Sequence, residues 1–207
     1  MDDVTICICT YGRGWSFKGK ELCQKLDIKF PKQLKIAYHE NNGNLLSVRN
    51  KALEMVSTEY VIFLDADDNL SDNYIEEMSK GTADIRVPSV RYVSRGKELE
   101  PYIPRVSACR HTDPCGPHCL PWGNYLVIGS MARTETLRAI EGFRDWPMYE
   151  DWDLWARCWI NEATFENIPT AIYQATIRPD SRNRQPTKQA KLNAHRAIAK
   201  DLGFPVP

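Results

Sequence analysis

An apolar run that ends in three carboxylates constrains this chain more than any other feature of its sequence. Residues 60–64 read Tyr-Val-Ile-Phe-Leu, and Asp65, Asp67 and Asp68 follow directly. A continuous apolar run of this length is typical of a central strand of a parallel sheet that is covered on both faces. Because ligands of open α/β sheets bind beyond the carboxyl ends of the strands, we expect the carboxylates to converge on a binding site.

Carboxylates crowded at one point repel one another, and a hard divalent cation would neutralise them. Mg²⁺ or Mn²⁺ held by one or two carboxylates usually completes its coordination with substrate phosphates. The pattern therefore indicates a metal–diphosphate site. The alternative is a polar turn that leads into the next helix, with Ser71 as its N-cap.

The composition is ordinary for a soluble globular domain and identifies no partner. The chain has 207 residues, of which 43% are hydrophobic, and Lys plus Arg balance Asp plus Glu at 27 each. We find no apolar segment long enough to span a membrane, and the acidic start Met1-Asp2-Asp3 is unlike a signal peptide. Seven cysteines without an export signal favour free thiols in a reducing cytoplasm.

Hydrophobic periodicity divides the chain into a regular first half and a less regular second half. Strands are predicted over residues 4–10, 34–39, 60–64, 85–94, 125–128 and 171–177, and helices over 17–26, 45–56, 72–80, 134–140 and from about 150. The β-α-β-α-β order of the first half predicts a parallel sheet with right-handed crossovers. The simplest account is one domain over 1–207, with a nucleotide-binding half over about 1–100 and an acceptor half over about 101–207.

The end of the chain is basic. Between Arg178 and Lys200, one acid, Asp180, faces a run of cations: Arg178, Arg182, Arg184, Lys188, Lys191, Arg196 and Lys200. Such a run is usually a solvated helix face, and binding of a polyanionic acceptor is the alternative.

Four motifs follow one another along the chain. They are Thr10-Tyr11-Gly12-Arg13, Asn42-Gly43 followed by residues 48–52, residues 64–68, and Gly142-Phe143 followed by residues 150–154. In this order they resemble the inverting glycosyltransferases of family two. The resemblance implies a GT-A fold, which is an α/β fold with a mostly parallel central sheet flanked by helices. It also implies a hexosyltransferase-type enzyme that uses a nucleotide-sugar donor, usually UDP-linked, with Mn²⁺ or Mg²⁺.

The resemblance also implies roles for residues of the first half. Asp65 and Asp67 correspond to the DxD motif, in which the first Asp contacts the ribose or sugar and the second binds the metal; Asp65 is a further candidate ligand. Thr10 and Tyr11 would line the nucleotide base, and Arg13 would belong to the same donor site.

Two further residues receive roles in the same way. Arg49 would lie near the donor diphosphate or sugar, although a buried Arg that ties a strand to a helix is an equal alternative. Asp151 would be the general base that deprotonates the acceptor hydroxyl, opposite the metal-stabilised leaving group. The alternative for this acidic stretch is a plain first helical turn, in which Asp153 pairs with Arg157 at i,i+4.

The chain departs from the family pattern in two places. The segment between Arg13 and Asn42 is short and offers no acidic loop to read a uracil base, so base selectivity stays open. Arg178 precedes Pro179 where family members often carry a metal- or phosphate-binding His. Arg does not ligate metals but pairs with phosphate in a bidentate manner, so we expect Arg178 to clamp the diphosphate and to loosen the metal dependence.

A Cys- and His-rich loop lies outside the family pattern. Its candidate zinc ligands are Cys109, His111, Cys115, His118 and Cys119. Such a density suits tetrahedral Zn²⁺, which would stiffen a polar loop, but the spacing fits no standard zinc finger. A loop without metal, and a disulfide or redox role, are the alternatives.

Other cysteines and aromatic residues are predicted to be structural. Cys7 and Cys9 alternate on the first predicted strand and are interpreted as small core residues. Trp152, Trp155 and Trp159 are mostly core by their spacing, with one exposed ring as a candidate platform for a sugar.

The sequence therefore predicts an inverting transfer of a sugar from a nucleotide diphosphate to an acceptor hydroxyl. The acceptor is open and includes a glycan, a lipid, a protein or DNA with hydroxylated bases. The alternative function is a non-catalytic nucleotide-sugar-binding module, which would keep Asp67 but lack the base. A nucleotidyltransferase is disfavoured, because no Gly-rich, Lys-bearing phosphate loop is found near the N-terminus.

Overall fold

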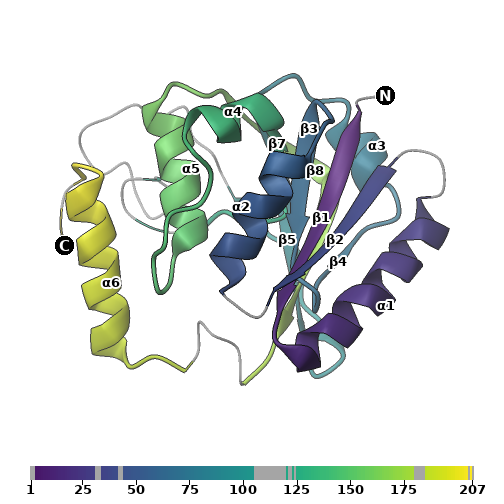
Figure 1. Ribbon diagram of the computed structural model, residues 1–207, viewed down its shortest axis with the longest axis horizontal. Coiled ribbons are helices and arrows are strands. Elements are labelled where there is room, and N and C mark those ends of the chain that lie inside the picture. Colours follow the sequence, from purple (N-terminus) through teal and green to yellow (C-terminus); the bar gives the residue numbers. More distant parts are fainter. Residues whose placement is uncertain are drawn as a thin grey trace.

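The computed structural model describes residues 3–30, 34–41, 44–104, 120, 123, 125–179, 185–204 and 206. In this part of the chain, eight strands form one sheet, and helices flank it (Figure 1). The predicted α/β architecture is confirmed. The sheet is mixed rather than purely parallel, because strands of the second half enter it in both directions.

The first three strands form the regular part of the sheet. They are β1 (Val4–Tyr11), β2 (Leu34–Asn41) and β3 (Tyr60–Leu64), in the order β2-β1-β3 and all parallel. The crossover helices α1 (Arg13–Lys29) and α2 (Leu45–Met55) pack on β1 and β2. The predicted β-α-β-α-β unit is thus confirmed, although α1 begins at Arg13 rather than near residue 17.

The rest of the sheet departs from parallel order next to β3. The short strand β7 (Met131–Arg133) is antiparallel to β3 and to β5 (Ile85–Ser94). Strand β8 (Phe165–Ile177) then runs parallel to β5, and β4 (Asn69–Leu70) closes the other edge antiparallel to β8. The loop after β3 therefore leads from the first half of the sheet to β4 at the far edge, next to β8.

A tight hairpin follows β5. Arg95 and Gly96 both have positive φ angles, 51° and 76°, and they connect β5 to β6 (Lys97–Glu98). Two positive φ angles are typical of the type I′ turn, whose twist matches that of the flanking strands. The strand predicted over residues 85–94 is confirmed.

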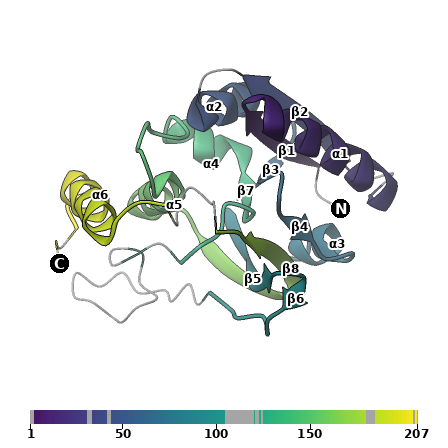
Figure 2. The same ribbon diagram turned by 90° about the horizontal axis from the view of Figure 1, so that it is seen from below.

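Four more helices cover the sheet and its ends. They are α3 (Tyr74–Met78), α4 (Thr134–Ala139), α5 (Glu150–Ile160) and α6 (Lys188–Asp201). Figure 2 places α6 beside α5, away from the first three strands. The contact between them includes His195 of α6, whose ring stacks on Trp152 of α5 with centroids 4.4 Å apart.

Two local predictions are wrong. Ser71 does not cap α3: its hydroxyl donates to the Asn73 side chain at 2.8 Å, and the cap position is Asn73. Residues 125–128 form no strand, because the chain turns there before it enters β7. Helix α3 is also shorter than the predicted span 72–80.

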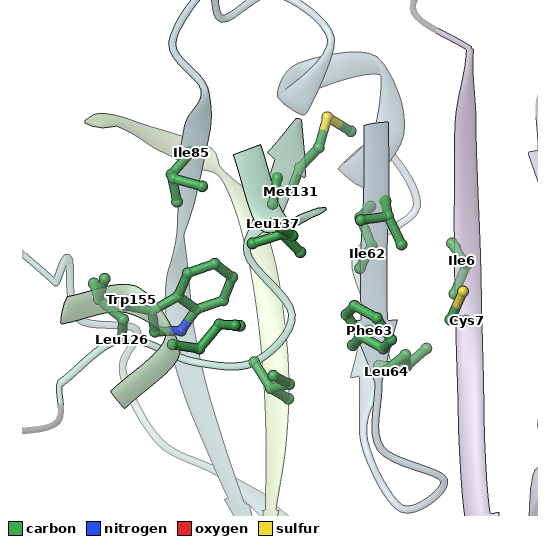
Figure 3. Close-up of a cluster of buried hydrophobic side chains, with 14 of the residues drawn as sticks. Ile6, Cys7, Ile62, Phe63, Leu64, Ile85, Leu126, Met131, Leu137 and Trp155 are labelled. Carbon is green, nitrogen blue, oxygen red and sulfur yellow. The ribbon is translucent and has the colours of Figure 1, made fainter. Parts of the chain in front are cut away.

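The core joins the regular strands to α5. Figure 3 shows Ile6 and Cys7 of β1, Phe63 of β3 and Trp155 of α5 among the buried side chains. Cys7 and Trp155 are fully buried, and burial raises the pKa of the Cys7 thiol to about 12. Such a thiol stays protonated and unreactive, so the prediction that Cys7 is a core residue is confirmed. Trp152 is likewise fully buried.

Among the described helices, none combines the length and the apolar character that crossing a membrane requires.

Candidate active site

A cavity of about 1090 Å³ lies at the carboxyl ends of β1 and β3. Parallel register sets Ile8 beside Leu64, so the residues that follow these two strands meet at one edge. The cavity is lined by Cys9, Thr10, Tyr11, Trp15, Leu45, Asp65, Ala66, Asp67, Asp68, Tyr92, Ala175, Thr176, Ile177, Arg178, Pro179, Gln185 and Lys191. It lies where open α/β sheets bind ligands, and the carboxylates predicted to converge there do so.

The three carboxylates of the loop after β3 have different surroundings. Asp68 accepts hydrogen bonds from the Tyr173 hydroxyl at 2.5 Å and from the Thr176 backbone N–H at 2.7 Å. Both donors belong to β8, so the hydrogen bonds of Asp68 anchor the loop to β8. Asp67 faces Arg178, whose Nε lies 3.4 Å from its Oδ2. Asp65 accepts from Arg49 at 2.7 Å, so each of the three carboxylates has a partner in the fold.

Burial and mutual repulsion disfavour the charged forms of Asp67 and Asp68 in this loop. Burial and then the charge of Asp65 raise the pKa of Asp67, against the opposing effect of Arg178 and Lys18. Burial, followed by Asp65, raises the pKa of Asp68 to about 8, although its bonds to β8 act in the opposite direction. A cation bound at this edge would relieve both effects.

Arg49 connects two of the sequence motifs. Its guanidinium donates to Asp65 at 2.7 Å and to Glu150 at 3.0 Å, and its side chain is only 3% exposed. Burial acts to lower the pKa of Arg49, but the charges of Asp65 and Glu150 outweigh it and raise the pKa, so the group stays charged. Arg49 is not among the cavity-lining residues. The structure therefore favours the alternative of a buried Arg that ties a strand to a helix.

Asn50, the residue after Arg49, contacts Gly142 and Phe143 of a different sequence motif. Its side chain donates to the Phe143 carbonyl and accepts from the Phe143 N–H, both at 2.8 Å. Gly142 has φ +65°, and a Cβ at this position would lie 2.6 Å from the Asn50 Oδ1, so only glycine fits without displacing the contact. The Phe143 ring lies edge-on to Phe63 of β3 and under the Arg49 guanidinium.

The acidic start of α5 contains one partly exposed carboxylate. Asp153 is fully buried and paired with Arg144 and with Arg157, the latter at 2.8 Å, as the i,i+4 alternative predicted. Asp151 is partly exposed, and its Oδ1 accepts the Trp152 N–H at 2.9 Å. Asp151 is not among the described residues that line the cavity. It is connected to the cavity through Glu150, Arg49 and Asp65.

Thr10 and Tyr11 line the cavity, as expected for donor-site residues. Thr10 is buried and Tyr11 is 39% exposed. Arg13 opens α1, and its side chain lies outside the described part of the structure.

Sequence reasoning missed cavity residues that come from other elements. Trp15 belongs to the first turn of α1, which was expected to be a loop, and its ring lies 4.3 Å from the Arg178 guanidinium carbon. Tyr92 of β5 and Lys191 of α6 also line the cavity. The basic character of residues 178–200 was a signal for Lys191, whereas no signal marked Tyr92.

The described residues contain no cluster of three or more His, Cys, Asp and Glu side chains arranged to hold a metal. The candidate zinc ligands Cys109, His111, Cys115, His118 and Cys119 lie outside the described residues. A cation that takes most of its ligands from a diphosphate needs only one or two carboxylates, and Asp67 with Asp65 fits that demand. Crowded and partly buried, these carboxylates are suitable donors for Mg²⁺ or Mn²⁺.

No sequence among curated proteins matches this chain. Its fold is similar to that of solved glycosyltransferases. A crystal structure of S. aureus TarS 1–349 is 16% identical, with a TM-score of 0.63 over 99% of this chain and 67% of that one. The same protein in complex with UDP is 17% identical, with a TM-score of 0.62 over 99% and 67%. GalNAc-T7 with UDP, GalNAc and Mn²⁺ is 13% identical, with a TM-score of 0.58 over 97% of this chain and 48% of that one.

A family model described as "Glycosyl transferase family 2" matches residues 18–129, which is more than half of the chain. The match includes the Asp65–Asp68 loop and Arg49. The chain therefore belongs to glycosyl transferase family 2.

Proposed function

We propose that this protein transfers a sugar from a UDP-sugar to an acceptor hydroxyl with inversion at the anomeric carbon. The observation that carries the proposal is the cavity at the ends of β1 and β3, in which Thr10 and Tyr11 face Asp65 and Asp67. Its volume of about 1090 Å³ suits a nucleotide-sugar together with part of an acceptor. The UDP in the TarS structure and the UDP, GalNAc and Mn²⁺ in GalNAc-T7 support the choice of donor.

In this proposal the donor site is assembled from separate elements. Thr10 and Tyr11 contact the nucleoside, with Arg13 beside them. Asp65 binds the ribose or the sugar, and Arg49 orients its carboxylate through the 2.7 Å hydrogen bond. Arg178 contacts the diphosphate, which its position at the cavity wall supports.

Asp67, with Asp65 as a second candidate, would hold Mn²⁺ or Mg²⁺. Such a cation would supply charge neutralisation of the departing diphosphate when it is bound. The protein contributes a loop that β8 fixes in place through Asp68, so that Asp67 meets the ligand without rearrangement.

Asp151 would be the general base. A base must accept the proton of the acceptor hydroxyl as the hydroxyl attacks from the face opposite the leaving group. Asp151 is partly exposed at the first turn of α5, and the chain Glu150–Arg49–Asp65 fixes that turn relative to the donor site. Two carboxylates tied to one buried guanidinium thus set the spacing between donor and base.

The test measures release of nucleoside diphosphate from a panel of sugar nucleotides, with Mn²⁺ and with EDTA. One donor is expected to turn over slowly with water as acceptor, and both Asp67→Ala and Asp151→Ala should abolish this turnover. Asp27→Asn, an exposed change on α1 outside the cavity, is the matched control and should behave as the parent protein.

The result also separates the alternatives. Tight donor binding without turnover, unaffected by Asp151→Ala, would contradict the enzymatic proposal and favour a nucleotide-sugar-binding module. The position of Asp151 outside the cavity lining is the observation that keeps this second function under test.

A further inference from the structure

Trp15, at the wall of the cavity, contacts two cations, of which Arg178 also lines the cavity. It belongs to the first turn of α1, is partly buried and lines the cavity. The Lys18 Nζ lies 4.7 Å from the centroid of its ring, and the Arg178 guanidinium carbon lies 4.3 Å from it. An indole ring attracts both cations through its quadrupole and restricts where each can lie. Two residues far apart in the sequence are thereby brought together.

Both cations act on Asp67. Arg178 Nε lies 3.4 Å from the Asp67 Oδ2, and Arg178 is only 20% exposed. Lys18 lines a smaller cavity of about 360 Å³ on which Asp67 also borders. The residue expected to hold the metal therefore already has positive charge from the protein beside it.

The geometry of these groups suits a diphosphate. A guanidinium is planar, presents a fork of N–H donors and pairs with phosphate oxygens in a bidentate manner, whereas an ammonium acts as a point charge. Arg178 stacks over Trp15 and lines the same cavity as Asp65 and Asp67, so its guanidinium is near the place expected for the diphosphate.

We propose that Trp15, Lys18 and Arg178 form a diphosphate-binding site made of the protein's own charges, which binds UDP without a divalent cation. This inference rests on the proposed function, because it assumes that a nucleoside diphosphate occupies the cavity. In the ligand-free protein Asp67 neutralises Arg178. When the diphosphate binds, it competes with Asp67 for Arg178, and a metal bound at Asp67 adds affinity to a site that already functions.

The proposal has a consequence that a purely metal-dependent site does not share. Removing the charge of Asp67 releases Arg178 and removes repulsion of the diphosphate. Asp67→Asn should therefore tighten UDP binding in EDTA, while it abolishes the gain in affinity that Mn²⁺ gives. In a site that depends on metal alone, Asp67→Asn would only weaken binding.

The experiment is calorimetric titration of UDP into the intact protein, in EDTA and in Mn²⁺. In EDTA we expect measurable binding that Arg178→Gln weakens about tenfold or more, because a charged bidentate pair is lost. Lys18→Gln should weaken it about threefold, as expected for an exposed point charge. Arg178→Lys keeps the charge but not the fork, and should fall between the parent and Arg178→Gln. Arg95→Gln, at the β5–β6 turn, is the matched control and should change nothing.

Thermal melts of each variant separate loss of binding from loss of folding, and Arg178→Lys replaces Arg178→Gln if the latter fails to fold. Binding of UDP in Mn²⁺ but not in EDTA would overturn this inference and leave the proposed function intact. Binding in EDTA that is insensitive to both Arg178 substitutions would also overturn it. Absence of UDP binding under both conditions would overturn the UDP donor itself.

Discussion

Two acidic segments of this protein look alike in sequence but are neutralised differently. The loop after β3 carries Asp65, Asp67 and Asp68, and the start of α5 carries Glu150, Asp151 and Asp153. In α5, two of the three carboxylates are paired with arginines in the fold: Glu150 with Arg49, and Asp153 with Arg144 and Arg157. In the loop, Asp65 and Asp67 also meet arginines, Arg49 and Arg178, but burial and repulsion still raise the pKa of Asp67 and of Asp68.

The difference shows that the surroundings of acidic residues, and not their number, indicate whether a segment belongs to the framework or to a binding site. Where buried carboxylates are paired with guanidinium groups, as Glu150 and Asp153 are, the segment is part of the framework. Where burial crowds carboxylates together, the fold keeps them at an electrostatic cost that a bound cation would remove. Asp67 lines the cavity in the first segment, and Asp151 is the partly exposed carboxylate of the second.

The largest expected effect comes from Asp151. Asp151→Asn keeps the size of the side chain and can still accept the Trp152 N–H, so folding should be unchanged. Loss of a general base should lower the rate of donor hydrolysis by about 10²–10⁴-fold. Steady-state release of UDP and a thermal melt measure the two effects separately. Asp145→Asn, an exposed change just before α5, is the matched control. A rate within about threefold of the parent would assign Asp151 to the framework with its neighbours.

For Asp153 we expect a loss of stability rather than a loss of catalytic rate. Asp153→Asn leaves two arginines facing a neutral side chain in the core, and breaking a buried ion pair in this way costs about 3–5 kcal/mol of unfolding free energy. Most of this cost should come from the unpaired charge of Arg157, because its side chain is only 11% exposed. Urea denaturation measures the loss. Glu21→Gln removes the exposed helical pair with Lys25 and should leave the urea midpoint in place. Equal midpoints for the two variants would contradict the framework role of this part of α5.

Glu150 tests whether the two segments are coupled. Glu150→Gln keeps a hydrogen-bond acceptor for Arg49 but removes its charge, so the start of α5 should lose its fixed distance from Asp65. We expect turnover of the donor to fall about tenfold, because small displacements of a reacting group are costly, while the Kd of the donor stays nearly unchanged. Measuring kcat and Kd separately distinguishes this from a binding defect. A fall in affinity with unchanged kcat would mean that Glu150 supports the donor site and not the base.

The parts of the fold that local sequence controls were predictable. The apolar runs of β1, β3 and β5 and the helical spacing of α2 need no distant partner, and each matches the structure closely. Helix α1 begins earlier than predicted. Residues 13–16 carry no apolar periodicity, and yet the backbone N–H groups of Trp15 and Ser16 donate hydrogen bonds to the Gly12 carbonyl. Strand β8 starts at Phe165 instead of residue 171, since its first part pairs with β5 ahead of a register shift near Pro88.

The candidate site was predictable only where the motif residues themselves act. The acidic loop and the cavity at the strand ends followed from the apolar run and its carboxylates. The partner of Arg49 did not, because Glu150 lies 101 residues further along the chain and no local pattern connects them. For the same reason the contact of Arg178 with Trp15 was missed. Long-range charge pairing depends on how the packed sheet brings distant segments together, so the local sequence of one segment does not predict it.

Asp68 gives the smallest expected effect and the clearest pH signature. In the folded protein its pKa is raised to about 8 from the usual 3.8, by burial first and by Asp65 second. The folded state therefore binds a proton more tightly than the unfolded state, and wild-type stability should fall as pH rises between these two values. Asp68→Asn has no charge to lose and can still accept the Thr176 N–H. In EDTA it should match the parent near pH 4 and exceed it near pH 8.5, by about 1 kcal/mol or a melting shift of about 2–4 °C. Parallel melting curves for parent and variant across this range would show that Asp68 is compensated in the fold as fully as Asp153, and the contrast between the two acidic segments would then be confined to Asp67.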